Sequence, residues 1–136
     1  MIRQFTRFSA IGVVGFVVDV LVLLLLVTLA GVDPYSSRAI SFLAAATTTW
    51  WCNRHFTFAA ANESALAQWG RFLAANGAGG AVNYGCYAAL IAAFAIMHAH
   101  PAIAAAIGAL AGLVVNFTLS RRFVFAATIR ARPRGS

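Results

Sequence analysis

The stretch Arg7–Leu26, which reads RFSAIGVVGFVVDVLVLLLL, decides the class of this protein. Asp19 is its only acid, and apolar residues continue to Ala30. An α-helix needs about 20 mainly apolar residues to cross roughly 30 Å of hydrocarbon. Phe8–Ala30 is therefore predicted to span a membrane. The run is too long for the core of a cleaved signal peptide, and the acid inside it argues against one.

The composition of the whole chain agrees with a membrane protein. Of its 136 residues, 62% are apolar and 10% are charged, against about 45–50% and 25% in soluble domains. The ten basic residues are all arginine, and the formal net charge is +7. Because the arginines lie at the ends of apolar runs, we expect them to face membrane lipids or an anionic lipid-borne substrate, and we expect no nucleic acid partner.

Three further apolar runs follow the first, and they extend over Arg38 or Ala39 to Trp51, Phe72–Met97 and Ala102–Leu119. The second run is short and needs its flanking residues to complete a span. Residues 128–136 carry arginine, proline and glycine, so we predict a disordered basic tail there. The expected fold class is an all-α integral membrane protein, with a single four-helix transmembrane domain over residues 1–127.

The second half of the chain repeats the first. Three pairs of matching residues share one spacing, namely Arg7 and Arg71, Phe8 and Phe72, and Asp19 and Asn83. A slightly larger spacing separates Pro34 from Pro101. The runs NRHFTF at Asn53–Phe58 and SRRFVF at Ser120–Phe125 share the larger spacing. We therefore predict two copies of a two-helix hairpin, over about residues 7–58 and 71–125. Each hairpin crosses twice, so both enter from the same side as a parallel repeat.

The arginines predict the orientation of the hairpins. All of them except Arg38 fall at the end of the hairpins that also carries the two chain termini. Loops rich in arginine stay on the cytoplasmic side of a membrane. Both termini and the loop between the hairpins are therefore expected in the cytoplasm.

Asp19 is an acid inside an apolar run. It lies about 18 Å along the helix from Arg7 at about 1.5 Å per residue, close to the bilayer midplane. An acid at that depth costs about 2.5–3.5 kcal/mol, so it should face the protein interior and have a partner. A hydrogen bond to Asn83 or Thr47 would hold the hairpins together. Alternatively, Asp19 is a polar position on a substrate or proton path.

Small residues and amides are concentrated in the second half of the chain. Gly108 and Gly112 form G-x-x-x-G, and Asn116 follows in the same run. Such residues let helices approach closely and bond to one another. The contact can lie within the chain or between two copies of it.

The motif Arg-x-Phe-x-Phe ends the second and fourth runs, beginning at Arg54 and at Arg121. Phenylalanines at period two form no stripe on a helix, so we expect the chain to leave the helix there, with the rings as an interfacial anchor. Anchoring and orientation alone can explain each arginine. Two arginines at equivalent places, with Arg122 beside the second, also offer planar donors suited to a lipid-linked phosphate.

Patterns of enzymes and metal sites are missing from the sequence. It has no nucleophile elbow, P-loop or zinc signature, so we expect neither an enzyme nor a cofactor. His98 and His100 lie in a short connection without a nearby acid or thiol, which argues against a metal site. Cys52 and Cys86 are expected at depths too different for a disulfide.

Four stretches in this order and spacing resemble the GtrA-like membrane proteins, over about Arg7–Phe125. They are RFSAIGVVGFVVDVLVLLLL, NRHFTF, RFLAANGAGGAVNYGCYAAL and NFTLSRRFVF. The family positions onto which residues of this chain fall are Asp19, Asn53, Arg54, Asn116 and Arg121. Ser120 departs from the asparagine that the family has before the arginine. The resemblance implies O-antigen or other cell-surface polysaccharide assembly, in which a polyprenyl-phosphate-linked monosaccharide crosses the bacterial inner membrane for a glycosyltransferase.

The expected function is therefore that of a multi-pass flippase for a polyprenyl-phosphate-linked sugar. The residues expected to bind the phosphate are Arg54, Arg121 and Arg122. The residues expected to meet sugar hydroxyls are Asp19, Asn53, Asn83 and Asn116. The alternatives are a proton-coupled exporter of the small multidrug-resistance type and a scaffold that recruits a glycosyltransferase without transport. Four short helices are few to enclose a path, so a homodimer or a partner subunit is expected.

Overall fold

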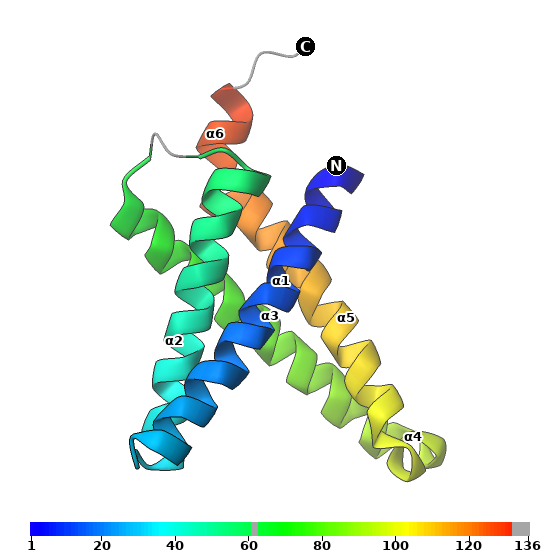
Figure 1. Ribbon diagram of the computed structural model, residues 1–136. Coiled ribbons are helices and arrows are strands. Elements are labelled where there is room, and N and C mark those ends of the chain that lie inside the picture. The colour runs from blue at the N-terminus through cyan, green and yellow to red at the C-terminus, as the bar shows by residue number, and fades with distance from the viewer. Residues whose placement is uncertain (61–62, 132–136) are drawn as a thin grey trace. The chain divides into compact units, whose positions relative to one another are not determined.

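The structure is a computed structural model that describes residues 1–60 and 63–131. In that part of the chain the secondary structure is helical, without a β-strand. Figure 1 shows the elements along the chain. They are α1 Ile2–Leu24, η1 Leu25–Leu29, α2 Pro34–Cys52, η2 Asn53–Thr57, α3 Ala65–Ala93, α4 Ala95–Ala99, α5 Pro101–Leu119, η3 Ser120–Val124 and α6 Ala126–Ala131.

Helix α1 continues without a break into the π-helical turn η1, so one apolar helix runs from Ile2 to Leu29. It stops at Gly31, whose φ of +65° is a left-handed conformation that glycine adopts at little cost. The amide of Val32 donates to the carbonyl oxygen of Leu26 at 3.0 Å and closes the helix end. Helix α2 then begins at Pro34, where a proline loses no helical hydrogen bond.

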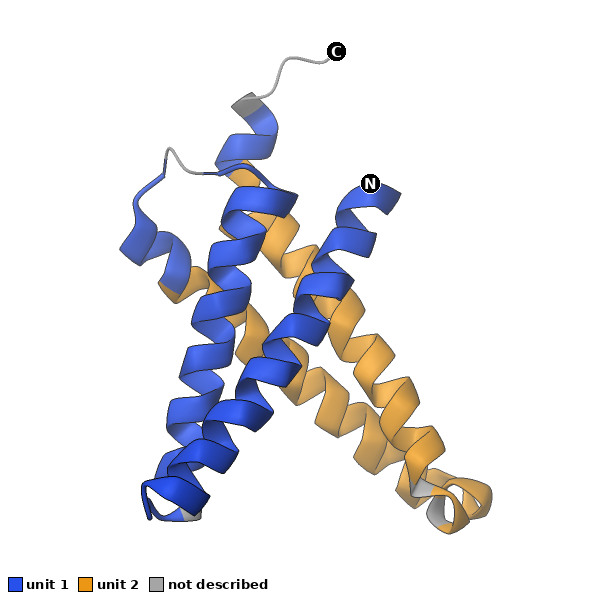
Figure 2. Cartoon of the chain, in the orientation of Figure 1, with its two compact units in different colours: residues 1–69, 127–136 blue, residues 70–126 orange. Residues whose placement is uncertain are grey.

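The chain divides into two compact units, which Figure 2 shows in different colours. Unit 1 comprises Met1–Trp69 together with the chain from Ala127 onward, and unit 2 comprises Gly70–Ala126. Unit 1 holds the hairpin of α1 and α2. Unit 2 holds most of α3 together with α5.

A glycine and a pair of aromatic rings join the two helices of unit 1. A Cβ atom on Gly15 would collide with the side chain of Thr49 and lie 3.7 Å from the carbonyl oxygen of Ala45. The absence of a side chain therefore lets α1 approach α2 closely. Nearer the chain terminus, the buried rings of Phe8 and Phe58 pack edge to face, with 6.4 Å between their centroids.

The helices of unit 2 pack in the same manner. A Cβ atom on Gly79 would collide with the side chain of Asn116, and one on Gly112 would lie 2.7 Å from the carbonyl oxygen of Gly79. The buried rings of Phe72 and Phe125 pack with 6.2 Å between their centroids. The second glycine of G-x-x-x-G is thus used for contact inside the chain.

The packing contacts of the two units fall on equivalent positions of the sequence repeat. The copies are 64 residues apart in the first helix of each hairpin, as from Gly15 to Gly79, and 67 apart in the second, as from Thr49 to Asn116. The equivalent features are the contacts Gly15–Thr49 and Gly79–Asn116, the ring pairs Phe8–Phe58 and Phe72–Phe125, and the turns η2 and η3. The repeat is therefore one of local packing as well as of sequence.

The end of the third predicted run differs from the prediction. We expected the helix to extend to Met97, but α3 ends at Ala93 because Phe94 is extended, with φ −129° and ψ 118°. The short helix α4 follows. His98, expected in a loop, lies within α4, and His100 caps its end.

The predicted disordered tail is helical at its start. Residues 128–131 belong to helix α6, in which alanine and isoleucine accompany the first arginine. Residues 132–136, with the last two arginines, lie outside the described part of the chain.

The expectation that the chain leaves the helix at Arg-x-Phe-x-Phe was wrong, because the backbone continues through the π-helical turns η2 and η3. Residues two positions apart on a helix point about 200° apart. The first phenylalanine of each motif is exposed, at 59% for Phe56 and 63% for Phe123. The second is buried, as Phe58 and Phe125. Only the first can anchor at a membrane interface, since the second belongs to the core.

Two helices in the described part of the chain are long and apolar enough to cross a membrane, Ile2–Leu29 and Ala102–Val124. Only 6% and 22% of their most apolar segments are buried inside the protein. Long apolar helices whose side chains remain exposed are typical of lipid-facing helices. A helix that is apolar all round must be covered by protein or lipid. The length and composition of these two helices therefore favour a membrane protein.

Candidate functional site

Arg54 is buried where α2 passes into η2, and protein groups hold its guanidinium. Its side chain is 7% exposed. Nη1 donates to Oε1 of Gln68 at 2.7 Å, and Nη2 donates to the carbonyl oxygen of Glu63 at 2.8 Å. The guanidinium carbon lies 5.6 Å from the ring centroid of Trp50. A buried cation is tolerated where hydrogen bonds satisfy it, as they do here.

Gln68 connects Arg54 to its surroundings. It is fully buried, its Oε1 also accepts from Nε1 of Trp50 at 3.1 Å, and it comes from the first turns of α3. The neighbouring Asn53 is buried too, and its Oδ1 accepts from the hydroxyl of Thr57 at 2.8 Å. Asn53 and Arg54, the two residues of this motif that were predicted to bind a ligand, thus form hydrogen bonds with other protein groups.

The equivalent turn of unit 2 has a different character. Arg121 stands at the position equivalent to Arg54, and its Nε is buried. Within the described residues, this atom has no hydrogen-bond partner, and neither have the buried Oγ of Ser120 and Oδ1 of Asn116. Each buried polar group left without a partner costs about 1–3 kcal/mol. Such groups are rare and call for an explanation, such as a bound ligand or water.

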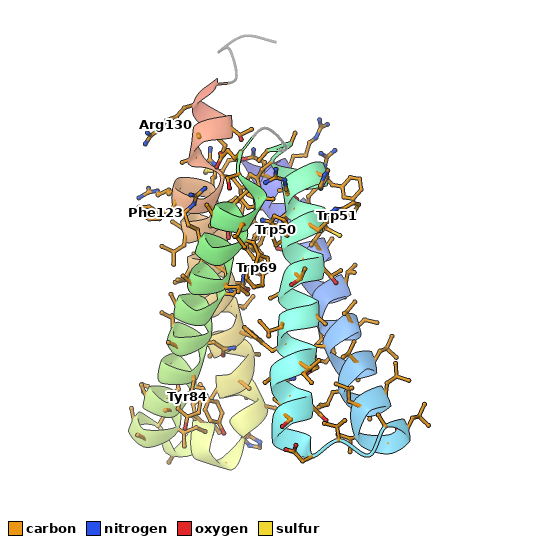
Figure 3. All side chains as sticks on the ribbon, turned by 90° about the vertical axis from the view of Figure 1, so that its left-hand side faces the viewer. Trp50, Trp51, Trp69, Tyr84, Phe123 and Arg130 are labelled. Atoms are coloured by element: carbon orange, nitrogen blue, oxygen red, sulfur yellow. The ribbon has the colours of Figure 1, made fainter. Side chains whose placement is uncertain are left out.

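A cavity lies beside this turn, within unit 2. Its volume is about 270 Å³, and its lining residues are Arg71, Ala74, Ala75, Leu119 and Phe123. Arg71 also donates to the carbonyl oxygen of Val124 at 3.4 Å. Figure 3 shows Phe123, which lies in η3 directly after α5. Arg122 next to it is exposed. The surroundings thus combine an apolar hollow with cationic side chains, which suits a lipid with an anionic head group.

Asp19 has a partner that the sequence analysis did not name. Nη1 of Arg38 contacts its Oδ2 at 2.5 Å, and the hydroxyl of Ser41 donates to its Oδ1 at 2.7 Å. The expected partner Thr47 is used elsewhere, because its hydroxyl accepts from Nε1 of Trp69 at 3.0 Å. Asp19 is therefore bound within the hairpin of unit 1.

The sequence did contain a signal for this ion pair. Arg38 is the one arginine at the opposite end of the predicted hairpins, and an acid inside an apolar run needs a cation or hydrogen-bond donor. Spacing along the chain does not identify the pair, because it predicts Asp19 near the midplane and Arg38 at the membrane surface. Gln68 was missed for a different reason, since nothing in its local sequence marks a fully buried amide.

Asn83 lies in α3 and faces α5. A Cβ atom on Gly108 would lie 2.6 Å from the carbonyl oxygen of Asn83 and 2.8 Å from its Oδ1. Asn83 also lines a cavity of unit 2 with Tyr84 and Tyr87. In unit 2, two of the predicted polar residues, Asn83 and Asn116, thus lie where the two helices of the hairpin meet.

Among the described residues, no group of three or more His, Cys, Asp or Glu side chains is placed to hold a metal ion. Cys52 and Cys86 are free thiols, both partly exposed.

These observations define a helical membrane protein built from a repeated hairpin, with unpartnered polar groups at the arginine-bearing end of the second copy. The transmembrane domain of the GtrA/DPMS family matches residues 7–125, which is most of the chain, and the protein belongs to this family. Membership indicates involvement in the handling of polyprenyl-phosphate sugars. A comparison with curated proteins gave no match.

Proposed function

We propose that this protein binds a polyprenyl-phosphate-linked monosaccharide at the cytoplasmic face of a bacterial inner membrane and lets its head group cross the bilayer. The observation that carries the proposal is the turn of Asn116, Ser120 and Arg121, in which three buried polar atoms have no hydrogen-bond partner among the described residues. The family membership of residues 7–125 supports the same substrate class.

The chemistry of the turn matches the head group of such a lipid. A phosphodiester carries negative charge and only acceptor oxygens, and a guanidinium supplies charged, directional donors for them. Arg121 has a buried Nε without a partner, and Arg122 beside it is exposed. In this proposal these two arginines bind the phosphate. Arg54 has a folding role instead, because its donors are taken by Gln68 and Glu63.

The sugar hydroxyls need polar partners during the crossing. Asn83 and Asn116 both lie in the hairpin of unit 2, and an amide can donate and accept hydrogen bonds. Asp19 and Asn53, also expected on this path, are bonded within unit 1 and have a supporting role in the proposal. The path for the head group is therefore assigned to the second repeat.

The proposed arrangement in the membrane is four crossing helices with both termini in the cytoplasm. The polyprenyl tail stays in lipid, and the apolar cavity next to Arg71 would receive the part of the tail that adjoins the phosphate. The protein makes and breaks no covalent bond in this scheme, so it is proposed to act without enzymatic activity or cofactor. A second copy of the chain or a glycosyltransferase would complete the path.

The alternative of a proton-coupled exporter has less support from the contacts. Such a protein needs an intramembrane acid that is available to exchange protons, whereas both oxygens of Asp19 are engaged, by Arg38 and by Ser41. A scaffold that recruits a glycosyltransferase is the other alternative, and it differs from a flippase by the absence of lipid flux.

The test compares a double arginine variant with a single arginine variant as control, in proteoliposomes that contain a polyprenyl phosphate glucose probe. Arg121→Ala with Arg122→Ala should weaken probe binding at least about tenfold, since hydrogen bonds to charged groups contribute about 1.5–3 kcal/mol. Arg130→Ala removes an exposed arginine of α6 and should leave binding unchanged.

Flux is measured in the same vesicles as the movement of labelled probe between leaflets. The wild-type protein should accelerate it, and the Arg121→Ala, Arg122→Ala variant should not. Unchanged binding in that variant would refute the phosphate site. Normal binding without flux in the wild-type protein would favour the scaffold.

A further inference from the structure

Unit 2 contains an open cavity that α3 and α5 line toward the end of the hairpin remote from Phe123, and it is distinct from the one at Arg71. Its volume is about 280 Å³, and its lining residues are Gly80, Asn83, Tyr84, Tyr87 and Ala105. The rings of Tyr84 and Tyr87 lie 6.5 Å apart, tilted by 37°. Figure 3 shows Tyr84 toward the end of α3 that is remote from Phe123.

The repeat shows what fills the equivalent place in unit 1. The equivalent pairs are Phe16 and Gly80, Asp19 and Asn83, Val20 and Tyr84, Leu23 and Tyr87, and Arg38 and Ala105. In unit 1, the side chain of Arg38 reaches Asp19 and forms an ion pair. In unit 2, Ala105 has no side chain that could reach Asn83, and a side chain at Gly80 would meet open space. The second repeat therefore has a cavity where the first has an ion pair.

The polar group in this cavity lacks a protein partner. Among the described residues, the amide of Asn83 makes no hydrogen bond to another protein group. Asn83 is partly exposed, and an amide without a hydrogen bond in an apolar medium is unfavourable, by about 2–7 kcal/mol when it is fully buried. Polar residues inside membrane-spanning segments are costly, and they are found on substrate paths as well as between helices. An acyl chain would leave the amide unsatisfied, so a ligand with hydroxyl groups fits the cavity better.

We infer that this cavity binds the monosaccharide of the lipid-linked substrate, an inference that rests on the function proposed above. A pyranose ring has an apolar face of C–H groups and an edge of hydroxyls. The rings of Tyr84 and Tyr87 match the apolar face, and Asn83 with the phenolic hydroxyls matches the edge. The lining carries no charged side chain, so the site selects an uncharged sugar over a uronic acid or an amino sugar.

The size of the cavity agrees with one sugar ring. Pockets for drug-sized ligands are about 300–1,000 Å³, and this one is slightly smaller. Its distance from the phosphate turn also matters. Asn83 lies twelve residues beyond Arg71 in the same helix, which is about 18 Å at about 1.5 Å per residue. The sugar therefore occupies this cavity after the head group has moved toward the middle of the membrane, and the site is a station on the path.

The test measures the affinity of the purified protein in nanodiscs for polyprenyl phosphate with and without glucose. Tyr84→Val with Tyr87→Leu installs the residues of the first repeat, and Asn83→Asp with Ala105→Arg transfers its ion pair into the cavity. We expect the wild-type protein to bind the glucose-bearing lipid about tenfold or more tightly than the sugar-free lipid. Both double variants should abolish this difference and leave the affinity for the sugar-free lipid unchanged. Tyr84→Phe with Tyr87→Phe keeps the rings and should lose only part of that difference.

Val20→Ala with Leu23→Ala changes the equivalent positions of unit 1 and serves as the matched control, with no expected effect on either lipid. Equal loss of both lipids in the cavity variants would identify a site for the prenyl chain and overturn the inference. Equal affinity of the wild-type protein for the two lipids would also overturn it, while the phosphate proposal would stand. Failure of the wild-type protein to bind either lipid would refute the proposed function itself.

Discussion

At the scale of single residues, the arginines of this protein differ in what satisfies them. Arg54 is buried with hydrogen bonds to Gln68 and Glu63, and Arg38 is paired with Asp19. Arg121 has a buried Nε for which the described part of the chain offers no hydrogen-bond partner. Sequence alone gives the same residue type at equivalent positions of a repeat, so the different roles follow from the neighbours. The contacts favour Arg121 over Arg54 as the arginine that is available to a ligand.

The ion pair of Asp19 and Arg38 is expected to stabilise the hairpin of unit 1. Asp19→Asn or Arg38→Gln alone leaves one charge without its partner, whereas the double variant removes both charges. The double variant should therefore be less destabilised than the sum of the two single variants, by about 0.5–3 kcal/mol. The measurement is a double-mutant cycle on unfolding in detergent. Additive effects would show that the two side chains do not interact.

The residue scale is where prediction from sequence was least complete. Asp19 was expected to pair with Asn83 or Thr47, but its observed partners are Arg38 and Ser41. A pair formed across a hairpin depends on the position of the turn and on the direction of each side chain. Neither can be obtained from apolar runs alone. Asn116 was named from its residue type, and its unpartnered oxygen is visible only when the packing is known.

At the scale of elements, glycines decide where helices meet. In α5 the backbone at Gly112 approaches the carbonyl oxygen of Gly79, where a Cβ atom would lie only 2.7 Å away. Gly77 in α3 has open space around it. The two glycines therefore have opposite expected responses to the same substitution.

Gly112→Ala should lower the stability of the protein by about 1–3 kcal/mol, because the new methyl group would force α3 and α5 apart. Gly77→Ala should be neutral or stabilising by up to about 1 kcal/mol, since alanine favours the helix. The measurement is the temperature at which the detergent-solubilised protein loses its monodisperse elution. An equal effect of the two substitutions would contradict the contact between α3 and α5.

The long helices were predictable because their apolar runs are long, and their boundaries were less so. The predicted run Phe72–Met97 is interrupted at Phe94, whose extended backbone no hydropathy pattern indicates. The π-helical turns were missed as well. They carry the same residues as an ordinary helix end, and only their packing sends Phe58 and Phe125 into the core. Local pattern thus predicts that a helix exists, while tertiary contact decides how it ends.

At the scale of the whole molecule, one hairpin pattern serves two purposes. In unit 1 the polar positions are closed by an ion pair and by the contacts of Arg54. In unit 2 the positions equivalent to the ion pair line a cavity, and Arg121, equivalent to Arg54, has a buried Nε without a hydrogen-bond partner among the described residues. Under the proposed function, the closed copy stabilises the fold and the open copy binds the substrate. For the open copy to take a substrate from the cytoplasm, its arginine-bearing end must face that side.

The orientation can be tested with single cysteines in a chain from which Cys52 and Cys86 have been removed by substitution with alanine. Ser36→Cys lies at the exposed start of α2, and Ser64→Cys is exposed just before α3. The excess of arginine at the latter end predicts that it is cytoplasmic. A membrane-impermeant maleimide should therefore label Ser36→Cys in spheroplasts and label Ser64→Cys only after the membrane is permeabilised. Labelling of Ser64→Cys from outside would reverse the topology, and partial labelling of both would indicate dual insertion. In either case Arg121 and Arg122 could not meet a cytoplasmic phosphate in every molecule, and the proposed phosphate site would be contradicted.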